Sequence, residues 1–260
     1  MKHTLQITSL LILFFLLAQV IGLFVIQSYY KEETLPLSLE RPVLEEDTSY
    51  WYLLVAIGIG TVLALVLAKF KAMKLWRVWF FISVVLTLTI AFAAFMPDEL
   101  AFGLAFIFGA LKIFRPNPII HNATELFIYA GLAGLFVPLL GLKSIVILLL
   151  VISLYDVIAV WKTRHMVSMA KFQTKSKIFA GLHLKYSKGR EAILGGGDIG
   201  FPLMFAGVVL KLGWYHALFV VGFTTLALAL LFFYSQKGKF YPAMPFLTIG
   251  CFAGFLLSLI

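Results

Sequence analysis

Charged side chains are scarce in this chain of 260 residues: they make up 13% of it, against 62% for apolar side chains. A soluble globular domain has about a quarter charged residues and about half apolar ones. The scarcity of charge therefore excludes a soluble protein and predicts a membrane protein. Cysteine is also nearly absent, because Cys251 is the only one. A single cysteine excludes an internal disulfide framework, and its position in the last apolar run indicates a packing role.

Two protease signatures are missing as well. None of the five histidines belongs to a His-Glu-x-x-His pattern, so a zinc protease would lack its metal ligands. No Gly-x-Ser-Gly motif occurs together with a histidine in an apolar run, which excludes a rhomboid-like serine protease. We therefore predict no metal and no cofactor.

Long apolar runs are abundant, and their length of about 20 residues is typical of transmembrane helices. We predict an all-α, polytopic membrane protein with nine such spans. The two runs between Leu100 and Leu142 are short and are separated by Pro116, Asn117 and Pro118, so a single re-entrant pair is an alternative there. The nine runs are Leu5–Ile26, Trp51–Ala68, Trp76–Met96, Leu100–Phe114, Leu126–Leu142, Ile145–Trp161, Leu194–Leu210, Tyr215–Tyr234 and Ala243–Ile260.

The distribution of Lys and Arg predicts the orientation of these helices, because both concentrate in cytoplasmic loops. With the N-terminus in the cytoplasm, the largest basic group lies between Trp161 and Leu194 on the cytoplasmic side. The acidic segment from Glu32 to Asp47 then lies outside, and so does the C-terminus. This arrangement accounts for the net charge of +9 without a nucleic-acid partner.

These features predict a single membrane domain over residues 1–260. Spans one to six occupy residues 1–161, a basic cytoplasmic loop occupies residues 162–193, and spans seven to nine occupy residues 194–260. The first apolar run is too long for a signal peptide and lacks a small-residue cleavage site, so we expect a retained anchor. Without a soluble module, any activity must lie inside the helix bundle.

Asp156 and Asp198 are the only acidic residues inside the predicted spans. A carboxylate at the centre of a spanning helix costs about 3 kcal/mol on insertion scales, so such residues usually serve a function. Counted along a helix from Lys162 and from Glu191, both lie roughly 10 Å from the cytoplasmic edge. Neither has a cation three or four residues away on its own helix. We therefore predict that the two carboxyl groups face each other and share a proton.

Such a pair holds an acid and a base in one site. The ionised carboxylate can take a proton from a water that attacks a peptide carbonyl, while the protonated one polarises the carbonyl oxygen. Gly195, Gly196 and Gly197 allow close approach of the backbone, and Pro202 removes a helical N–H donor near Asp198. A loosened backbone can bind a substrate in extended form. The pattern predicts amide hydrolysis without a metal or cofactor.

Three short motifs follow one another along the chain. They are Tyr155-Asp156 in the sixth predicted span, Gly195-Gly196-Gly197-Asp198 at the start of the seventh, and Pro242-Ala243-Met244 at the start of the ninth. They resemble the YD, GxGD and PAL motifs of presenilin and signal peptide peptidase, the GxGD intramembrane aspartyl proteases. The sequence from Tyr155 to Met166 looks most like archaeal presenilin homologues. The resemblance covers the whole chain and implies a presenilin-like fold with presenilin's orientation.

The resemblance implies that Asp156 and Asp198 are the catalytic residues. It also implies that Pro242, Ala243 and Met244 lie beside them and help to position the substrate. Met244 stands where the family usually has leucine, a change of similar volume that packing tolerates.

Two further features are expected to support the active site. Tyr155 is one residue from Asp156 and points to a different face of the helix, so it is expected to pack against or orient the site. Gly195, Gly196 and Gly197 are expected to shape the backbone before Asp198.

The implied activity is that of an endopeptidase that cleaves inside transmembrane segments. The expected substrates are single-span membrane proteins or signal-peptide remnants in the bilayer, and the expected location is the cell membrane of an archaeon. The loop over residues 162–193 is short beside that of presenilin, which argues against self-cleavage into two fragments. No accessory subunit is expected, and a homo-oligomer is compatible with the sequence.

Other interpretations of the same residues stay open at this point. Asp198 after a glycine run is also the pattern of a helix N-cap. A prepilin peptidase also uses an aspartate after a glycine pair, but it has fewer spans and lacks the proline motif. A cation or proton transporter, or a leak channel, also uses paired intramembrane carboxylates. Gly250 and Gly254 form a GxxxG pattern, which by itself indicates helix packing.

Overall fold

The computed structural model describes residues 4–30, 32, 34–41, 44–46, 48–70, 72–162, 179–187, 190–236 and 241–260. Of the predicted basic loop over residues 162–193, residues 163–178 and 188–189 lie outside this described part. The cytoplasmic placement of that loop therefore stays a prediction.

Helices dominate the described chain, and each of the nine predicted apolar runs overlaps one of them. Within the described residues, six helical segments are long and apolar enough to cross a membrane, while α8 and α10 are shorter apolar helices. The helices are α1 (Leu5–Tyr29), α2 (Ser49–Lys69), α3 (Met73–Ala93), α4 (Asp98–Phe114), α5 (Pro118–Phe136), α6 (Leu142–Val157), α8 (Gly196–Leu210), α9 (Trp214–Tyr234) and α10 (Met244–Leu257).

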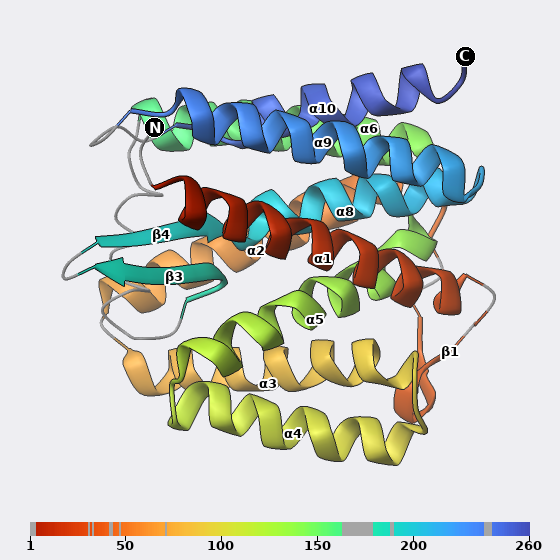
Figure 1. Cartoon of the computed structure of the whole chain (residues 1–260). Coiled ribbons are helices and arrows are strands. Elements are labelled where there is room, and N and C mark those ends of the chain that lie inside the picture. The colour runs from red at the N-terminus through yellow and green to blue at the C-terminus, as the bar shows by residue number, and fades with distance from the viewer. Residues whose placement is uncertain are drawn as a thin grey trace.

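The helices form a bundle around α8 (Figure 1). Helix α8 contacts α1, α5, α6, α9 and α10, while α3 and α4 pack together at the far edge next to α5. Leu203, Phe205, Ala206 and Val209 of α8 are fully buried, because a helix that is apolar all round belongs in the centre of a bundle. Helix α2 is mostly exposed and contacts only the neighbouring α3 and α6 to any extent.

The N-terminal half of α5 differs from the prediction, which placed the start of this span at Leu126. The helix begins at Pro118, and the Asn117 side chain caps it by accepting a hydrogen bond from the Ile119 N–H at 2.8 Å. Polar residues such as Asn122 made this segment look like a loop. In the structure α4 and α5 are two separate helices joined by residues 115–117, so the choice between two full spans and a re-entrant pair stays open.

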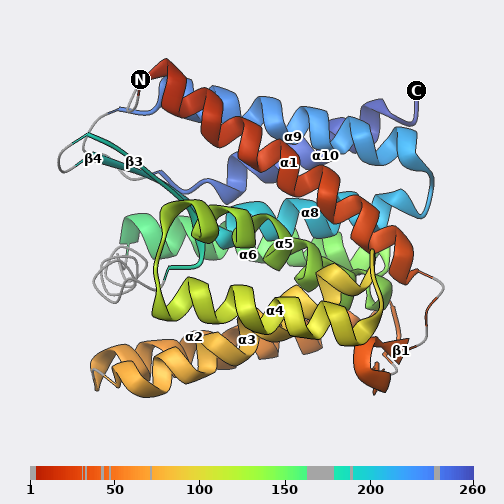
Figure 2. The same ribbon diagram turned by 60° about the horizontal axis from the view of Figure 1, so that its bottom comes forward.

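Two short antiparallel hairpins were not expected from the sequence. One consists of β1 (Thr34–Leu35) and β2 (Leu39–Glu40), joined by the 3-10 turn η1 (Pro36–Ser38). The other consists of β3 (Gly181–Ser187) and β4 (Arg190–Gly195), with Leu182 opposite Leu194. Figure 2 shows the β3–β4 hairpin at the same end of the bundle as the N-terminus, and β1 at the end where the C-terminus lies.

The β3–β4 hairpin corrects the view of this region as a structureless linker followed by a helix from Leu194. Leu182 and Leu194 are buried while Ile193 is 39% exposed, so side chains alternate between the core and the outside as strands require. The alternation covers only a few residues between basic ones, which is why it was missed. The strand β4 runs to Gly195, and α8 begins directly after it.

Gly250 and Gly254 allow α10 to lie against α9, as the GxxxG pattern predicts. A Cβ at position 250 would lie 2.9 Å from the Phe223 carbonyl oxygen and from the Thr224 Cα. A Cβ at position 254 would lie 2.7 Å from the Phe219 carbonyl oxygen. The helix-packing interpretation of these glycines is therefore confirmed.

Gly250→Ala is expected to lower the free energy of unfolding by about 1–3 kcal/mol, because the added methyl group must push the α9 backbone away. Thermal unfolding of the purified protein in detergent measures the effect. The matched control is Gly222→Ala on α9, where a Cβ meets nothing within 4 Å. That control should change stability by less than about 1 kcal/mol. Equal effects of the two substitutions would contradict the close contact.

Candidate active site

Three helices, α6, α8 and α10, pack against one another and bring the three sequence motifs together. Asp156 is the penultimate residue of α6, Asp198 lies in the first turn of α8, and Met244 is the first residue of α10. Each motif therefore lies at a helix end, where backbone N–H groups or carbonyls lack a partner within the helix. Backbone N–H groups at these helix ends are the hydrogen-bond donors to the two aspartates.

Asp156 is held by the backbone of the proline motif. Asp156 is only 4% exposed, and its carboxylate accepts a hydrogen bond from the Met244 N–H at 3.1 Å. A second bond comes from the backbone of Ala243. Next to this contact, the hydroxyl groups of Ser153 and Thr248 join α6 to α10 at 2.7 Å. The motif thus touches the aspartate through its main chain, which explains how methionine can replace leucine at position 244.

The backbone widens directly after Asp156. Helix α6 continues as a single π-helical stretch, η3 (Ile158–Lys162). A π-helical turn is rare and is frequently found at functional sites. Here it lies between the aspartate and the end of the described segment at residue 162.

Asp198 lies in the first turn of α8, and Gly195 is the residue that caps this helix. The interpretation of Asp198 as the N-cap is therefore wrong by three positions. Its carboxylate accepts a hydrogen bond from the backbone of Gly195, as the third residue of a helix does in a capping box. A Cβ at position 195 would lie 3.2 Å from the Asp198 Oδ2 atom, so glycine leaves room for the carboxylate.

The carboxyl groups of Asp156 and Asp198 lie close enough for their charges to interact. Among the described residues, no Lys, Arg or His forms an ion pair with either carboxyl group. Two interacting acids without a counter-ion among the described residues cannot easily both ionise, so the pair is suited to sharing one proton. Such a pair can supply an acid and a base in one site.

The predicted matching depth of the two aspartates assumed a helix from Glu191 to Asp198. The structure corrects this, because the chain is a β-strand up to Gly195. The depth of Asp198 is therefore set by the point at which β4 ends and α8 begins.

The other predicted site residues differ in their burial and in their contacts. Pro242 is buried one residue before Ala243, and Gly197 is exposed. The Tyr155 hydroxyl forms a hydrogen bond with Thr61 of α2, so this side chain links α6 to its neighbour. Gly196 packs closely against the ring of Tyr129. A Cβ at position 196 would lie 2.6 Å from the tyrosine oxygen, so a larger residue would not fit without a shift.

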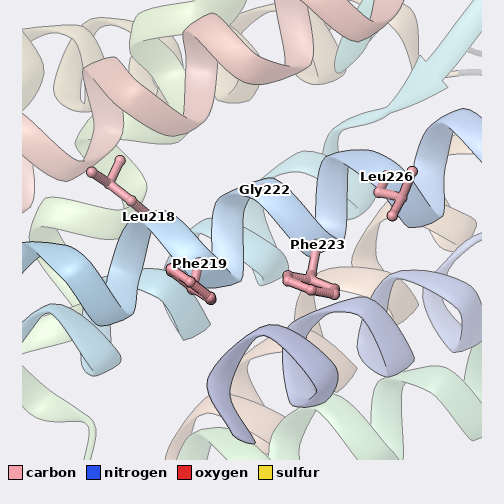
Figure 3. A pocket seen from close by; sticks show the side chains of 5 residues that line it. All are labelled: Leu218, Phe219, Gly222, Phe223 and Leu226. Atoms are coloured by element: carbon pink, nitrogen blue, oxygen red, sulfur yellow. The ribbon is translucent and has the colours of Figure 1, made fainter. Parts of the chain in front are cut away.

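An apolar groove on α9 lies apart from this site. It is lined by Leu218, Phe219, Gly222, Phe223 and Leu226, and Figure 3 shows their side chains along one face of the helix. None of these residues can transfer a proton. Over the described ranges, no three His, Cys, Asp or Glu side chains cluster as metal ligands.

Comparison with known proteins identifies the relatives of this chain. A family model described as "Signal-peptide peptidase, presenilin aspartyl protease" matches residues 12–260. The chain belongs to this family. It is therefore an aspartyl protease of the membrane, and the resemblance noted in its motifs is confirmed. No individually curated protein matches it.

Two solved structures have the same fold as this chain. Both are structures of a presenilin family intramembrane aspartate protease, one in a C222 and one in a P2 space group. The first is 18% identical, with a TM-score of 0.69 over 97% of this chain and 98% of that one. The second is 19% identical, with a TM-score of 0.69 over 96% of each chain. The presenilin-like fold predicted from the sequence is thus confirmed.

The protease holds a third buried acid that the sequence analysis missed. Glu125 of α5 is fully buried, and its Oε1 atom lies 2.6 Å from the Nζ atom of Lys112, which is 4% exposed. Its Oε2 atom accepts a hydrogen bond from the Tyr129 hydroxyl and another from the Gly181 N–H at 2.9 Å. The statement that only two acids lie inside the spans is therefore wrong. The signal was a lone Lys and a lone Glu in adjacent apolar segments, each of which needs a partner of opposite charge.

Lys112→Met is expected to lower the free energy of unfolding by about 3–5 kcal/mol, because it leaves Glu125 buried without its counter-ion. Lys211→Met is the control, since Lys211 pairs with Glu46 at 3.0 Å where both side chains reach solvent. That pair should contribute less than about 1 kcal/mol. Chemical unfolding of both variants in detergent gives the comparison. A Lys112 variant as stable as the control would mean that Glu125 is not charged in the folded protein.

Proposed function

We propose that Asp156 and Asp198 together hydrolyse peptide bonds within the transmembrane segments of other membrane proteins. The observation that carries the proposal is the pair itself: two carboxyl groups from different helices interact, and no Lys, Arg or His among the described residues forms an ion pair with either. Backbone donors from Met244, Ala243 and Gly195 hold them in orientation. Such a pair needs no metal or cofactor.

The chemistry follows from one shared proton. The ionised carboxylate takes a proton from a water molecule, whose oxygen bonds to the carbonyl carbon of the substrate. The protonated carboxyl group transfers its proton to the carbonyl oxygen, so the tetrahedral intermediate is a diol. The C–N bond then breaks as the nitrogen receives a proton from one carboxyl group and a hydroxyl of the diol gives its proton to the other. The products are a carboxylic acid and an amine, and the pair returns to its starting protonation.

The substrate must be extended at the cleaved bond, because a helix buries its carbonyls in its own hydrogen bonds. The outer edge of β4 can hold an extended chain. The inner edge of β3 is occupied, since the backbone of His183 bonds to Asn122 through both its N–H and its carbonyl, each at 2.9 Å. His183 is paired with Ile193 in the hairpin, and its backbone groups bond to Asn122 rather than to β4. The two residues are therefore a non-hydrogen-bonded pair, and the N–H and carbonyl of Ile193 point to the outer edge of β4. A substrate strand added there would continue toward Asp198.

The helix lengths support a site below the membrane surface. Helices α8 and α10 have 15 and 14 residues, so each is only roughly 22 Å long, against about 30 Å of hydrocarbon. If all nine helices cross, the starts of α8 and α10 lie inside the bilayer rather than at its edge. Water must then reach the aspartates through the protein.

The proposed orientation keeps the N-terminus in the cytoplasm and the C-terminus outside. The two termini lie at opposite ends of the bundle, and the β3–β4 hairpin lies with the N-terminus (Figure 2). This agrees with a basic segment on the cytoplasmic side and an acidic segment outside. The proposed substrates are single-span proteins or signal-peptide remnants in the cell membrane, cleaved without accessory subunits.

Asp156→Asn and Asp198→Asn should each lower the rate of cleavage by more than about a thousandfold, because each removes one half of the proton-sharing pair. The assay uses purified full-length protein in lipid vesicles with a labelled single-span peptide. Asp98→Asn is the matched control: this residue caps the Leu37 N–H at 2.8 Å in the β1–β2 turn, far along the chain from the site. It should cleave at the wild-type rate. Asparagine variants that still cleave would refute the proposal, and an aspartate-dependent ion flux without cleavage would favour a transporter.

The rate of cleavage should follow a bell-shaped pH profile. At low pH both carboxyl groups are protonated, so the base is lost, and at high pH both are ionised, so the acid is lost. The maximum lies where one proton is shared. Initial rates in vesicles buffered across the acidic and neutral range test this. A rate that stays flat over that range would argue against a two-carboxyl mechanism.

A further inference from the structure

The buried acid Glu125 is connected to the start of α8 by two separate routes. One runs through the strand β3, and the other through the side chain of Tyr129. We propose that Glu125 and Tyr129 are positioning residues that hold Asp198 in place for catalysis. This proposal rests on the assignment of Asp198 as a catalytic residue and adds two residues that act through it.

The first route fixes the strand that precedes the site. The Gly181 N–H bonds to Glu125, and the Gly181 carbonyl accepts a hydrogen bond from the Nε2 atom of His121 at 2.9 Å. One turn of α5 therefore holds both polar groups of this residue. Gly181 lies opposite Gly195 in the hairpin, and the Gly196 N–H bonds to the Ala180 carbonyl at 3.2 Å. The position of Gly195, whose backbone bonds to Asp198, thus depends on the contact with Glu125.

The second route acts on the helix start directly. The Tyr129 hydroxyl donates to Glu125, so the ring has one fixed orientation. The ring lies against Gly196 and Gly200, the first and fifth residues of α8. Its hydroxyl is also close enough to Asp198 for the two groups to interact electrostatically. A shift of this ring would move the first turn of α8 and its carboxylate.

The chemistry of the network favours positioning over stability alone. A buried ion pair such as Lys112–Glu125 usually gives no more stability than apolar residues of the same volume. What it does give is a defined geometry, because every donor is directed at a particular oxygen. Lys112 also bonds to the Thr124 hydroxyl at 3.1 Å and to the His121 carbonyl at 3.3 Å. The glutamate is thereby placed where it can reach both Gly181 and Tyr129.

Tyr129→Phe is the first test, because it removes the hydroxyl group and keeps the ring against Gly196. In the vesicle assay, kcat should fall about tenfold while KM stays unchanged, since a misplaced carboxylate affects the reaction more than binding. Binding of a peptide with a hydroxyethylene group at the cleavage position should weaken by a similar factor, because this group mimics the tetrahedral intermediate.

Tyr29→Phe is the matched control. Tyr29 of α1 is also buried, and its hydroxyl donates to the Ile90 carbonyl at 2.8 Å, at the opposite end of the bundle. Loss of one buried hydrogen bond there should leave kcat at the wild-type value. If Tyr129→Phe also keeps the wild-type kcat, Tyr129 only fills space and the proposal is overturned. If both variants lose kcat equally, the effect is one of general stability, and the proposal is again overturned.

A second variant tests Glu125 without leaving a buried charge unpaired. Lys112→Met and Glu125→Gln together remove both charges and keep the volume of the side chains. This double variant should fold and should lose kcat about as much as Tyr129→Phe. Adding Tyr129→Phe to it should cause little further loss, because both changes interrupt the same path. Independent, multiplying losses would show that Glu125 does not act through Tyr129.

These outcomes are distinguishable from failure of the proposed function. If Asp198→Asn still cleaves, the catalytic assignment fails whatever Tyr129→Phe does. If Asp198→Asn is inactive and Tyr129→Phe is fully active, the catalytic assignment stands and only the positioning role is refuted.

Discussion

A carboxyl group inside a bilayer must find its hydrogen-bond donors within the protein, because hydrocarbon offers none. Three acids inside the helix bundle of this protein meet this constraint with main-chain N–H groups. Asp156 uses Met244, and Glu125 uses Gly181. Asp198 uses the backbone of Gly195. Such N–H groups are free at the start of a helix and along the edge of a strand, and all three acids use donors at the start of a helix or at the start of β3.

That requirement explains the irregular features around the site. Helices α8 and α10 are short, a strand leads into α8, and α6 ends in a π-helical turn. In a structural helix bundle each of these would be a defect, since it exposes backbone groups that lipid cannot satisfy. Here the exposed groups hold the acids. The surrounding helices α1, α5 and α9 are long and regular, and they shield the irregular centre from lipid. The polar site therefore depends on an apolar envelope, to which α5 also contributes the buried polar residues Glu125 and Tyr129.

The sequence predicts the envelope better than the centre. Hydropathy locates the nine helices of the described residues, because each is apolar over several turns. It fails at Pro118–Glu125, where polar residues inside a helix look like a loop, and at β3–β4, where alternation lasts only a few residues. It cannot pair Lys112 with Glu125, because nothing local relates two residues on different helices. The pairing of the two aspartates stays a prediction that rests on a general argument: an acid in an apolar run without a cation must find a partner elsewhere, and the two carboxyl groups do interact electrostatically.

The glycines before Asp198 show why a motif carries more information than its composition suggests. From sequence they appear equivalent, as a loosened stretch that permits close approach. In the structure each has a different neighbour. Gly195 caps α8 and leaves space beside the carboxylate, Gly196 accommodates the ring of Tyr129, and Gly197 is exposed next to Phe201. Only the first two are constrained by contacts inside the described protein. At Gly197 a Cβ would meet only the ring of Phe201, at 3.5 Å, which is an ordinary contact distance, so packing in the described structure does not require glycine at this position.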